Sequence, residues 1–360
     1  MPLSLTPAER RARARADLRM GVPVCIAGSG QAALIAAIES LRPARFRELA
    51  GDGGAVLAIT ARRAGTLKVP AYDGDLARME LPVGATLEWA QAVADPAGDL
   101  SSPMKGPFAT ARGGPADLHR AGIALAKEAR LLPAVLVRGL GATAEARALG
   151  LTVLDLATDG TPDDAAHLDE VVSARLPMAL AGAGRLHVFR PDDGGEEHYA
   201  IEIGQPGRAA PVLARLHSAC FTGDVLGSRK CDCGAQLHNA LEAMGREGAG
   251  VLLYLNQEGR GIGLANKMRA YRLQDEGFDT VEANHRLGFE DDERDFRIGA
   301  ALLRAMGFAS VRLMTNNPAK IEMMRAQGIE VAERVPLRVA RTDENAAYLA
   351  AKAAKSGHLL

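Results

Sequence analysis

Residues 220–233, which read CFTGDVLGSRKCDC, contain three of the four cysteines of this chain: Cys220, Cys231 and Cys233. Two thiolates one residue apart can converge on one ion where the backbone turns between them, and the third arrives from the end of the preceding segment. Three protein ligands leave one coordination position open, as in catalytic zinc sites, whereas structural zinc sites are closed by a fourth protein ligand. The sequence therefore predicts a catalytic zinc site whose open position holds a water with a pKa lowered towards neutrality.

Two other interpretations of these cysteines are small buried core residues and a disulfide. Gly223, Gly227 and Gly234 interrupt the same stretch, which is typical of a loop and not of a core element. Three clustered thiols among only four also fit a reducing compartment with metal chemistry better than a disulfide framework. We therefore favour the metal site.

The composition of the chain limits what the protein can bind. Its 360 residues predict two domains, and 48% hydrophobic with 24% charged residues is the composition of a soluble globular protein. A formal net charge of -1 gives no overall basic field for nucleic acid, and 4% aromatic residues provide few surfaces on which bases could stack. Nucleic acid is therefore not an expected partner.

No apolar run approaches the roughly 18 residues of a membrane-spanning helix. The arginines near the N-terminus are interrupted by Glu9 and Asp17 and adjoin no apolar stretch of signal-peptide type. The sequence TPAE at residues 6–9 is instead that of a helix capping box, which predicts a surface helix over residues 7–19, with a basic docking arm as the alternative. These features predict a cytoplasmic protein without a membrane partner.

The N-terminal half alternates short apolar runs with helical patterns, which predicts an α/β or α+β unit with its own core. The expected strands are residues 23–26, 55–60 and 134–137, the expected helices are 32–41 and 117–130, and 95–115 is an expected loop. The turn at 28–30 lies between a predicted strand and a predicted helix, but the full glycine fingerprint of a phosphate-binding loop is missing. No convergent set of acids, histidines or cysteines precedes residue 140, so this half shows no clear chemistry.

The C-terminal half follows a turn-rich interdomain region at residues 141–175. Its expected strands are 187–190, 199–203, 211–217, 251–255 and 311–315, and its expected helices are 236–247 and those beginning near Leu264, Phe296 and Pro318. The fold class expected for the whole chain is α/β (α+β), with two domains that each contain a mixed sheet and packed helices.

The strand at 251–255 runs into the turn NQEGRGIG at residues 256–263 and then into a helix. Backbone N–H groups at such a turn suit an anion, and Arg260, Lys267 and Arg269 favour phosphate over a solvated basic face. Lys320 falls in the first turn of a predicted helix, against the helix dipole, which indicates a second phosphate contact. The acids at 291–295 precede another helix and by themselves are explained as helix caps.

Residues from about 175 to 360 closely resemble GTP cyclohydrolase II, the zinc enzyme that commits GTP to riboflavin biosynthesis. The runs that carry the resemblance are ARLHSACFTGD, CDCGAQL, LLYLNQEGRGIGLANKMRAY, LQDEGFDTVEANHRLGF, DERDF, LMTNNPAKIE and the tail DENAAYLAAKAAKSGHLL. On this basis we expect a catalytic domain at 176–345 and a C-terminal tail at 346–360.

The resemblance implies that Cys220, Cys231 and Cys233 bind one zinc ion per subunit, whose water attacks C8 of guanine so that the imidazole ring opens and formate leaves. It also implies that Asp292 is the general base and that Arg294 is a nucleophile towards the α-phosphate, which gives a guanylyl-enzyme and releases pyrophosphate. Arginine is a poor nucleophile while protonated, so electrostatic stabilisation of the triphosphate is an alternative role for Arg294. The product would be 2,5-diamino-6-(5-phosphoribosylamino)pyrimidin-4(3H)-one.

The family binds GTP through positions that correspond here to Arg215, Leu216, His217, Ser218, Gln236, Glu258, Gly259, Arg260, Thr280, Thr315 and Lys320. The side chains of Gln236 and Glu258 suit the guanine edge, and the cations among these residues suit phosphates. Tyr271 matches the position that favours full deformylation over a formamide product. Mg²⁺ is expected with the triphosphate, and the family implies a homodimer.

Two departures from the family pattern are visible. Ala219 precedes the first cysteine where the family usually has Glu, and Arg229-Lys230 stands where an apolar residue followed by Arg is usual. Neither removes a zinc ligand, but Ala219 lacks a contact that bears on substrate affinity or rate. It motivates a second hypothesis, a homologue with altered product or substrate in pyrimidine metabolism. A third hypothesis is a nucleotide-binding regulator that keeps zinc without turnover.

Residues 1–140 more distantly resemble 3,4-dihydroxy-2-butanone 4-phosphate synthase, the usual fusion partner, in the runs ALIAAIESLRPARFRELAGDGGAVLAIT and ALAKEARLLPAVLV. The acidic metal-binding cluster of that family is replaced here by AGSGQAA at residues 27–33, and its His-Thr-Glu motif by Leu118-His119-Arg120. Metal-assisted enolisation needs those oxygen ligands. We therefore expect this half to lack synthase activity and to serve stability, assembly or regulation.

Overall fold

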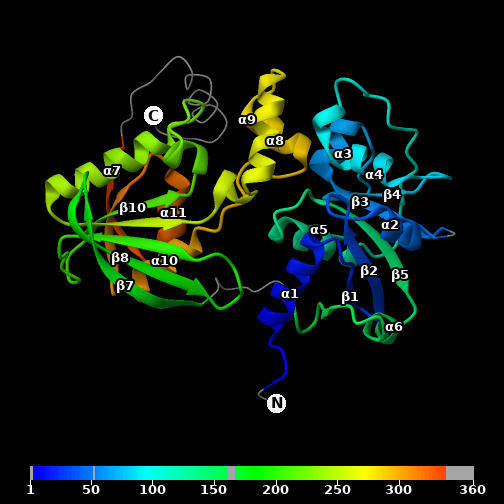
Figure 1. Ribbon diagram of the computed structural model, residues 1–360, viewed down its shortest axis with the longest axis horizontal. Helices are drawn as coiled ribbons and strands as arrows, with labels where there is room; N and C mark the ends of the chain where they lie inside the picture. The colour runs from blue at the N-terminus through cyan, green and yellow to red at the C-terminus, as the bar shows by residue number, and fades with distance from the viewer. Residues whose placement is uncertain (1–2, 52, 161–166, 338–360) are drawn as a thin grey trace. The chain divides into compact units, whose positions relative to one another are not determined.

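A computed structural model describes residues 3–51, 53–160 and 167–337, and the chain divides into two compact units (Figure 1). Unit 1 comprises Met1–Thr161 and Ala265–Glu293, and unit 2 comprises Pro162–Leu264 and Arg294–Leu360. Each unit has its own mixed sheet with packed helices, which confirms the expected fold class. The predicted tail at 346–360 lies outside the described residues, as do residues 161–166 of the predicted interdomain region.

Unit 1 is built on a six-stranded sheet with the strand order β4-β3-β5-β2-β1-β6. Its strands are β1 (Val24–Gly28), β2 (Gln31–Ala37), β3 (Ala55–Thr60), β4 (Leu76–Glu80), β5 (Ala134–Leu140) and β6 (Val153–Asp155). Its helices are α1 (Pro7–Arg19), α2 (Pro43–Ala50), α3 (Ala61–Leu67), α4 (Leu87–Ala94), α5 (Asp117–Glu128), α6 (Thr143–Ala148), α8 (Leu264–Asp275) and α9 (Thr280–Leu287), with a short 3-10 turn at Pro96–Gly98. Two of these helices, α8 and α9, therefore come from the C-terminal half of the chain, which contains the three clustered cysteines.

The first helix confirms the prediction made from its capping box. The backbone N–H of Glu9 donates to Thr6 Oγ1 at 3.2 Å, and the N–H of Thr6 donates to Glu9 Oε2 at 2.7 Å. These bonds satisfy two of the N–H groups that a helix start leaves without backbone partners. A bidentate ion pair between Arg11 and Glu128 of α5 holds α1 against unit 1.

The predicted helix at 32–41 is wrong, because this segment forms β2, in the interior of the sheet between β1 and β5. Six of its seven residues are buried, so the strand shows no alternation of polar and apolar positions, and a short apolar run of this kind cannot be distinguished from a buried helix by periodicity. The turn at Ser29 and Gly30 then closes an antiparallel hairpin, in which Gly28 pairs with Gln31. Since no helix follows the turn, the geometry of a phosphate-binding loop is absent there.

Unit 2 is built on a seven-stranded sheet with the order β13-β12-β10-β11-β9-β8-β7. Its strands are β7 (Leu168–Met178), β8 (Gly182–Pro191), β9 (His198–Ile203), β10 (Val212–Ser218), β11 (Gly250–Leu255), β12 (Ser310–Met314) and β13 (Glu330–Val335). Its helices are α7 (Cys233–Glu247), α10 (Arg297–Ala305) and α11 (Pro318–Ala326), with short turns of π-helix at Phe221–Val225 and of 3-10 helix at Glu258–Gly261. All strands and helices that we predicted in this half are present within a few residues.

The centre of this sheet brings three chain segments to one edge. Strand β10 runs parallel to β11 on one side and to β12 on the other, with Leu216 opposite Leu253 and Ala214 opposite Leu313. Their inward-facing leucines are buried in one apolar core. The carboxyl ends of parallel strands lie at the same edge of a sheet, which is where α/β proteins bind ligands. The segments after these three strands contain most of the residues that we predicted to bind zinc and GTP.

Candidate active site

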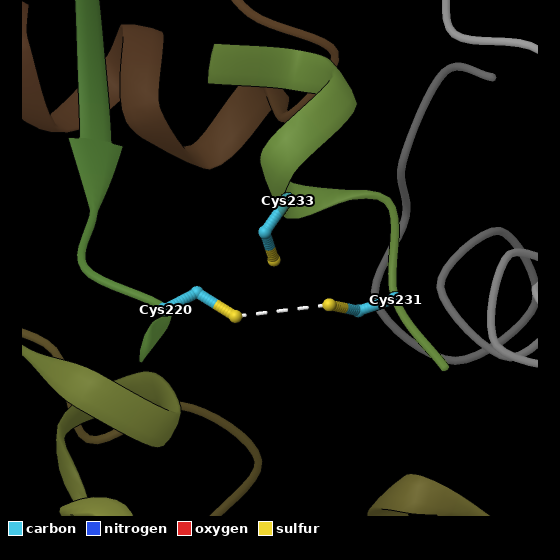
Figure 2. Close-up of side chains that lie close together, drawn as sticks. All are labelled: Cys220, Cys231 and Cys233. Atoms are coloured by element: carbon cyan, nitrogen blue, oxygen red, sulfur yellow. Dashed lines mark hydrogen bonds between the residues drawn. The ribbon is translucent and has the colours of Figure 1, made fainter. Parts of the chain in front are cut away.

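The three predicted zinc ligands converge on one point in unit 2. Cys220 follows β10, Cys231 lies in the loop before α7, and Cys233 is the first residue of α7; Figure 2 shows their sulfur atoms directed towards one another. The Sγ atoms of Cys220 and Cys231 are 3.7 Å apart, and all three sulfurs lie within 4.8 Å of one another. Zinc–sulfur bonds of about 2.3 Å place thiolates at such separations, so the donor set fits this metal.

A glycine shapes the space around the sulfurs. A Cβ atom added at Gly223 would lie 3.0 Å from the Sγ atoms of both Cys220 and Cys231, and equally close to Cys233 Cβ. The backbone N–H of Gly223 also donates to Cys220 Sγ at 3.3 Å. Because only hydrogen fits at this position, the backbone of the cysteine loop closes one side of the cluster. The sequence alone indicates only a loop at this glycine.

The three thiols lie so close together that each disfavours the ionised form of its neighbours, and a cation bound between them would remove this effect. The pKa of Cys233 is raised well above its usual value, first by its contacts with the thiols of Cys220 and Cys231 and then by burial. The pKa of Cys231 is also raised, in the first place by its contact with Cys220. Thiolates are the metal-binding form of cysteine, and a divalent cation between three sulfurs reverses this preference for the protonated state.

A buried carboxylate that the sequence analysis did not single out supports the first cysteine. Asp224 accepts hydrogen bonds from the backbone N–H of Cys220 at 3.0 Å and from the hydroxyl of Tyr254 at 2.9 Å. His217 Nε2 of β10 lies 3.0 Å from the same carboxylate oxygen. Burial, followed by the charge of Asp224 and its hydrogen bond, raises the pKa of Tyr254, so the phenol stays a donor. The signal available in the sequence was an aspartate four residues after a predicted ligand.

The glycine-rich turn after β11 lies against the cysteine loop. Glu258 Oε2 accepts a hydrogen bond from the backbone N–H of Phe221 at 2.6 Å, and its Oε1 accepts one from Gly259 at 3.1 Å. Gly259 and Arg260 both adopt left-handed backbone angles, with φ 64° and 61°. This conformation is unfavourable for arginine, and such strain is concentrated at functional sites.

Arg215, predicted to contact GTP, is buried under the site. Its Nη1 donates to the carbonyl oxygen of Met314 at 2.8 Å and its Nη2 donates to Gln236 Oε1 at 2.5 Å. Burial lowers the pKa of Arg215 to about 10. Gln236 in turn donates to Asp232 Oδ2, which lies between two of the cysteines in sequence. These bonds connect β10, β12 and the start of α7.

Two cations meet on one aromatic ring beside the end of β10. The guanidinium of Arg294 and the ammonium of Lys320 each lie 4.7 Å from the ring centroid of Phe296. Arg294 Nη1 donates to Ser218 Oγ at 3.3 Å, and Lys320 Nζ donates to the carbonyl oxygen of Leu216 at 3.1 Å. Both cations lie beside the end of β10, and this arrangement suits an anion such as a phosphate.

The other predicted residues divide between the two units. Thr315 is buried after β12 and accepts a hydrogen bond from the N–H of Asn317, which caps α11 as predicted. Tyr271, Thr280 and Asp292 belong to unit 1, because they lie in the segment Ala265–Glu293. Thr280 Oγ1 accepts a hydrogen bond from Gln274 Nε2 at 3.3 Å. Unit 2 thus contains the cysteines and the other predicted GTP contacts.

Three convergent thiols at the carboxyl end of a parallel strand, with buried cations on the neighbouring segments, are typical of an α/β enzyme whose site can hold a metal ion and a small anionic substrate. The sequence model of GTP cyclohydrolase II matches residues 169–336. A GTP cyclohydrolase-2 from Azospirillum brasilense is 44% identical over 358 residues, which cover 96% of this chain and 93% of that protein. The chain belongs to the GTP cyclohydrolase II family.

Two further comparisons describe shorter or more distant proteins. A GTP cyclohydrolase-2 from Azotobacter vinelandii is 53% identical over 190 residues, which are 53% of this chain and 91% of that protein. A solved structure of RibBX, a two domain 3,4-dihydroxy-2-butanone 4-phosphate synthase from A. baumannii, covers 92% of this chain and 100% of its own, at 16% identity and a TM-score of 0.33.

Proposed function

We propose that this chain is a zinc-dependent GTP cyclohydrolase II that converts GTP to 2,5-diamino-6-(5-phosphoribosylamino)pyrimidin-4(3H)-one, formate and pyrophosphate, the first step of riboflavin biosynthesis. The observation that carries the proposal is the cluster of Cys220, Cys231 and Cys233 at the carboxyl end of β10, inside the region that the family model matches. Zinc bound by these thiolates supplies Lewis acidity for hydrolysis of the guanine imidazole ring.

The residues around the cluster suit the two ends of a nucleotide. Arg294 and Lys320, paired on Phe296, are suited to the phosphates because both are cations beside the end of β10. Glu258 carries a carboxylate next to the cysteine loop, and a carboxylate is suited to accept the N–H groups of guanine. Such paired contacts discriminate against adenine, because a mismatched base leaves buried polar groups unsatisfied.

Proton transfer and the choice of product are assigned to the α8–α9 segment. Asp292 acts as general base, and Tyr271 favours complete deformylation. Arg294 contributes either as the nucleophile towards the α-phosphate or as an electrostatic stabiliser of the triphosphate. A carboxylate base that removes the proton is chemically necessary to the first of these roles, because a protonated guanidinium has no lone pair available for attack.

Three other parts of the proposal concern partners and location. Mg²⁺ accompanies the triphosphate, the protein is a homodimer, and it acts in the cytoplasm. None of the helices among the described residues is long and apolar enough to cross a membrane.

The N-terminal half has no synthase activity, because residues 27–33 form a hairpin of small side chains where that chemistry needs carboxylates.

The test is incubation of the zinc-loaded protein with GTP and Mg²⁺, with formate, pyrophosphate and the nucleotide product quantified separately. Equal release of formate and pyrophosphate with a diaminopyrimidine product is the expected result. Pyrophosphate without formate would favour the second hypothesis, an altered product, for which Ala219 is the motivating residue. Zinc and GTP binding without turnover would overturn the proposal in favour of a regulatory homologue.

A further inference from the structure

The segment that contains α8 and α9, residues 265–293, is the α8–α9 segment. Its sequence matches the GTP cyclohydrolase II family, but it folds as part of unit 1. Residues 265–293 lie inside the region matched by the GTP cyclohydrolase II model, yet they pack with residues 1–161. The same segment contains Tyr271, Thr280 and Asp292, which the proposed function assigns to substrate contact and catalysis. The contacts that hold this segment in place therefore come from the N-terminal half of the chain.

The backbone of this segment contacts the N-terminal half at Gly288, the residue that ends α9 with a φ of +89°. The hydroxyl of Thr60, at the end of β3, donates to the carbonyl oxygen of Gly288 at 2.8 Å in a buried position. A Cβ atom added at Gly288 would lie 2.8 Å from Pro133 Cγ and 2.9 Å from Thr60 Oγ1. The segment therefore touches the N-terminal half at a point where no side chain fits.

Ion pairs hold the residues on both sides of Asp292. Lys127 of α5 pairs with Glu293 at 2.6 Å, and its ammonium lies 5.9 Å from the ring centroid of buried Phe289. Arg62 of α3 pairs with Glu290 at 2.7 Å. The peptide that carries Asp292 is thus held at positions 290 and 293 by side chains from the N-terminal half.

Helix α8 is held in the same way. Asn266, which is fully buried, donates to the carbonyl oxygen of Arg130 at 3.0 Å. Arg269 pairs with Glu39 at 3.0 Å and with Asp95 at 3.3 Å. These ion pairs hold α8 on the N-terminal half, whereas the sequence favours a phosphate contact for Arg269. The segment is anchored at its beginning and at its end.

The length of the Azotobacter vinelandii protein indicates that not every family member has the N-terminal half that makes these contacts. That GTP cyclohydrolase-2 matches 53% of this chain with 91% of its own length, so too little of it remains to match the N-terminal half. The Azospirillum brasilense protein, by contrast, matches 96% of this chain. The N-terminal half is therefore an addition to some members of the family, and in this chain it makes the contacts that hold α8 and α9.

We propose that the N-terminal half is the structural support of the α8–α9 segment, and that Thr60 and Lys127 are positioning residues for Tyr271 and Asp292. This inference rests on the proposed function, which gives those two residues their roles. It assigns to a half without synthase chemistry a direct part in the turnover of GTP. Small displacements of catalytic groups reduce rates strongly, so loosening the support should lower kcat more than it raises KM.

The first test compares two glycine variants of the full-length, zinc-loaded protein. Gly288→Ala introduces the clash with Thr60 and Pro133, whereas Gly277→Ala, in the same segment and also at positive φ, meets nothing within 4 Å. We expect Gly288→Ala to lower kcat by about 10-fold or more with unchanged zinc content, beyond the effect of Gly277→Ala. Equal kcat values for the two variants would overturn the proposal.

A second pair of variants covers the case in which Gly288→Ala fails to fold. Lys127→Met removes the charge that pairs with Glu293, and Arg120→Met removes a charge seven residues earlier on α5 that pairs with Asp75 and Asp117. We expect a lower kcat for Lys127→Met alone, together with faster hydrogen exchange of residues 265–293. If the wild-type protein does not turn over GTP, the proposed function fails, and exchange then decides the support role: equal exchange in the two variants overturns it.

Discussion

His217 Nε2 lies 3.0 Å from Asp224 Oδ2, and each of these side chains is only 3% exposed. A carboxylate can only accept, so Nε2 of His217 carries the hydrogen, and Nδ1 of the neutral ring is an acceptor. Burial lowers the pKa of His217, which favours this neutral form. Nδ1 is buried and has no hydrogen-bond partner among the described residues. One carboxylate thus fixes the orientation of His217 and the backbone of Cys220.

Replacing Asp224 should weaken the metal site through this carboxylate. We expect Asp224→Asn to lower zinc affinity by about 10- to 100-fold, the usual effect of changing a residue that orients a metal ligand. Competition with a chromophoric chelator measures this affinity. Tyr254→Phe, which removes one hydrogen bond to Asp224 and leaves those of Cys220 and His217, should have a smaller effect. Unchanged zinc affinity in Asp224→Asn would contradict the supporting role.

The space at Gly223 makes a second prediction about the metal. Gly223→Ala should reduce the zinc content of the purified protein, because the new methyl group would lie 3.0 Å from two of the sulfurs. Gly207→Ala, in the same unit and with nothing within 4 Å, is the matched control.

The cysteines themselves give a separate prediction. Cys231→Ser should abolish zinc binding and ring opening together, because it removes one of the three predicted zinc ligands. Ring opening by a zinc-free Cys231→Ser protein would refute the mechanism.

Arg294 is predicted to act on the triphosphate. Arg294→Ala removes the guanidinium from Phe296 and Ser218 and should abolish release of pyrophosphate. Zinc content should be unchanged, since Arg294 is not one of the three cysteines that form the cluster. Pyrophosphate formation is followed by a coupled assay, and mass spectrometry of the wild-type protein with GTP detects a guanylyl-enzyme. Full activity of Arg294→Ala would exclude both roles.

The stability of unit 1 should depend on pH through His119. Burial, and then the nearby charge of Arg78, lowers the pKa of His119 to about 4. The unfolded chain binds a proton near pH 6.5 and the folded chain only near pH 4, so the free energy of unfolding is at its full value above pH 6.5 and falls as the pH drops towards 4. Chemical denaturation at several pH values measures this.

The control for this prediction is His119→Gln, which removes the titrating ring. The pH dependence between 6.5 and 4 should be shallower in that variant, by up to about 1.4 kcal/mol for each unit of pKa shift that is lost. The carboxylates with lowered pKa values, such as Asp75 and Glu290, remain in both proteins and contribute equally. Identical pH profiles would show that His119 titrates normally in the folded protein.

Local interactions explain most of what could be predicted correctly. The capping box of Thr6 and Glu9 and the cap of Asn317 depend on neighbours within three residues, so the helices α1 and α11 begin where the sequence indicates. Strand β2 was mistaken for a helix because its identity depends on pairing with β1 and β5. A buried segment with apolar residues on both faces has no periodicity from which to read its structure.

The sequence by itself predicted the cluster of Cys220, Cys231 and Cys233, since their spacing limits how far apart their sulfurs can be. It also determined the family, whose motifs are continuous runs of residues. Only the tertiary structure decided that Gly223 closes the sulfur cluster and that Asp224 joins His217 to Cys220, because these are contacts of side chains packed in three dimensions. It likewise decided that α8 and α9 pack on the N-terminal half, since burial and ion pairing between distant segments leave no pattern along the chain.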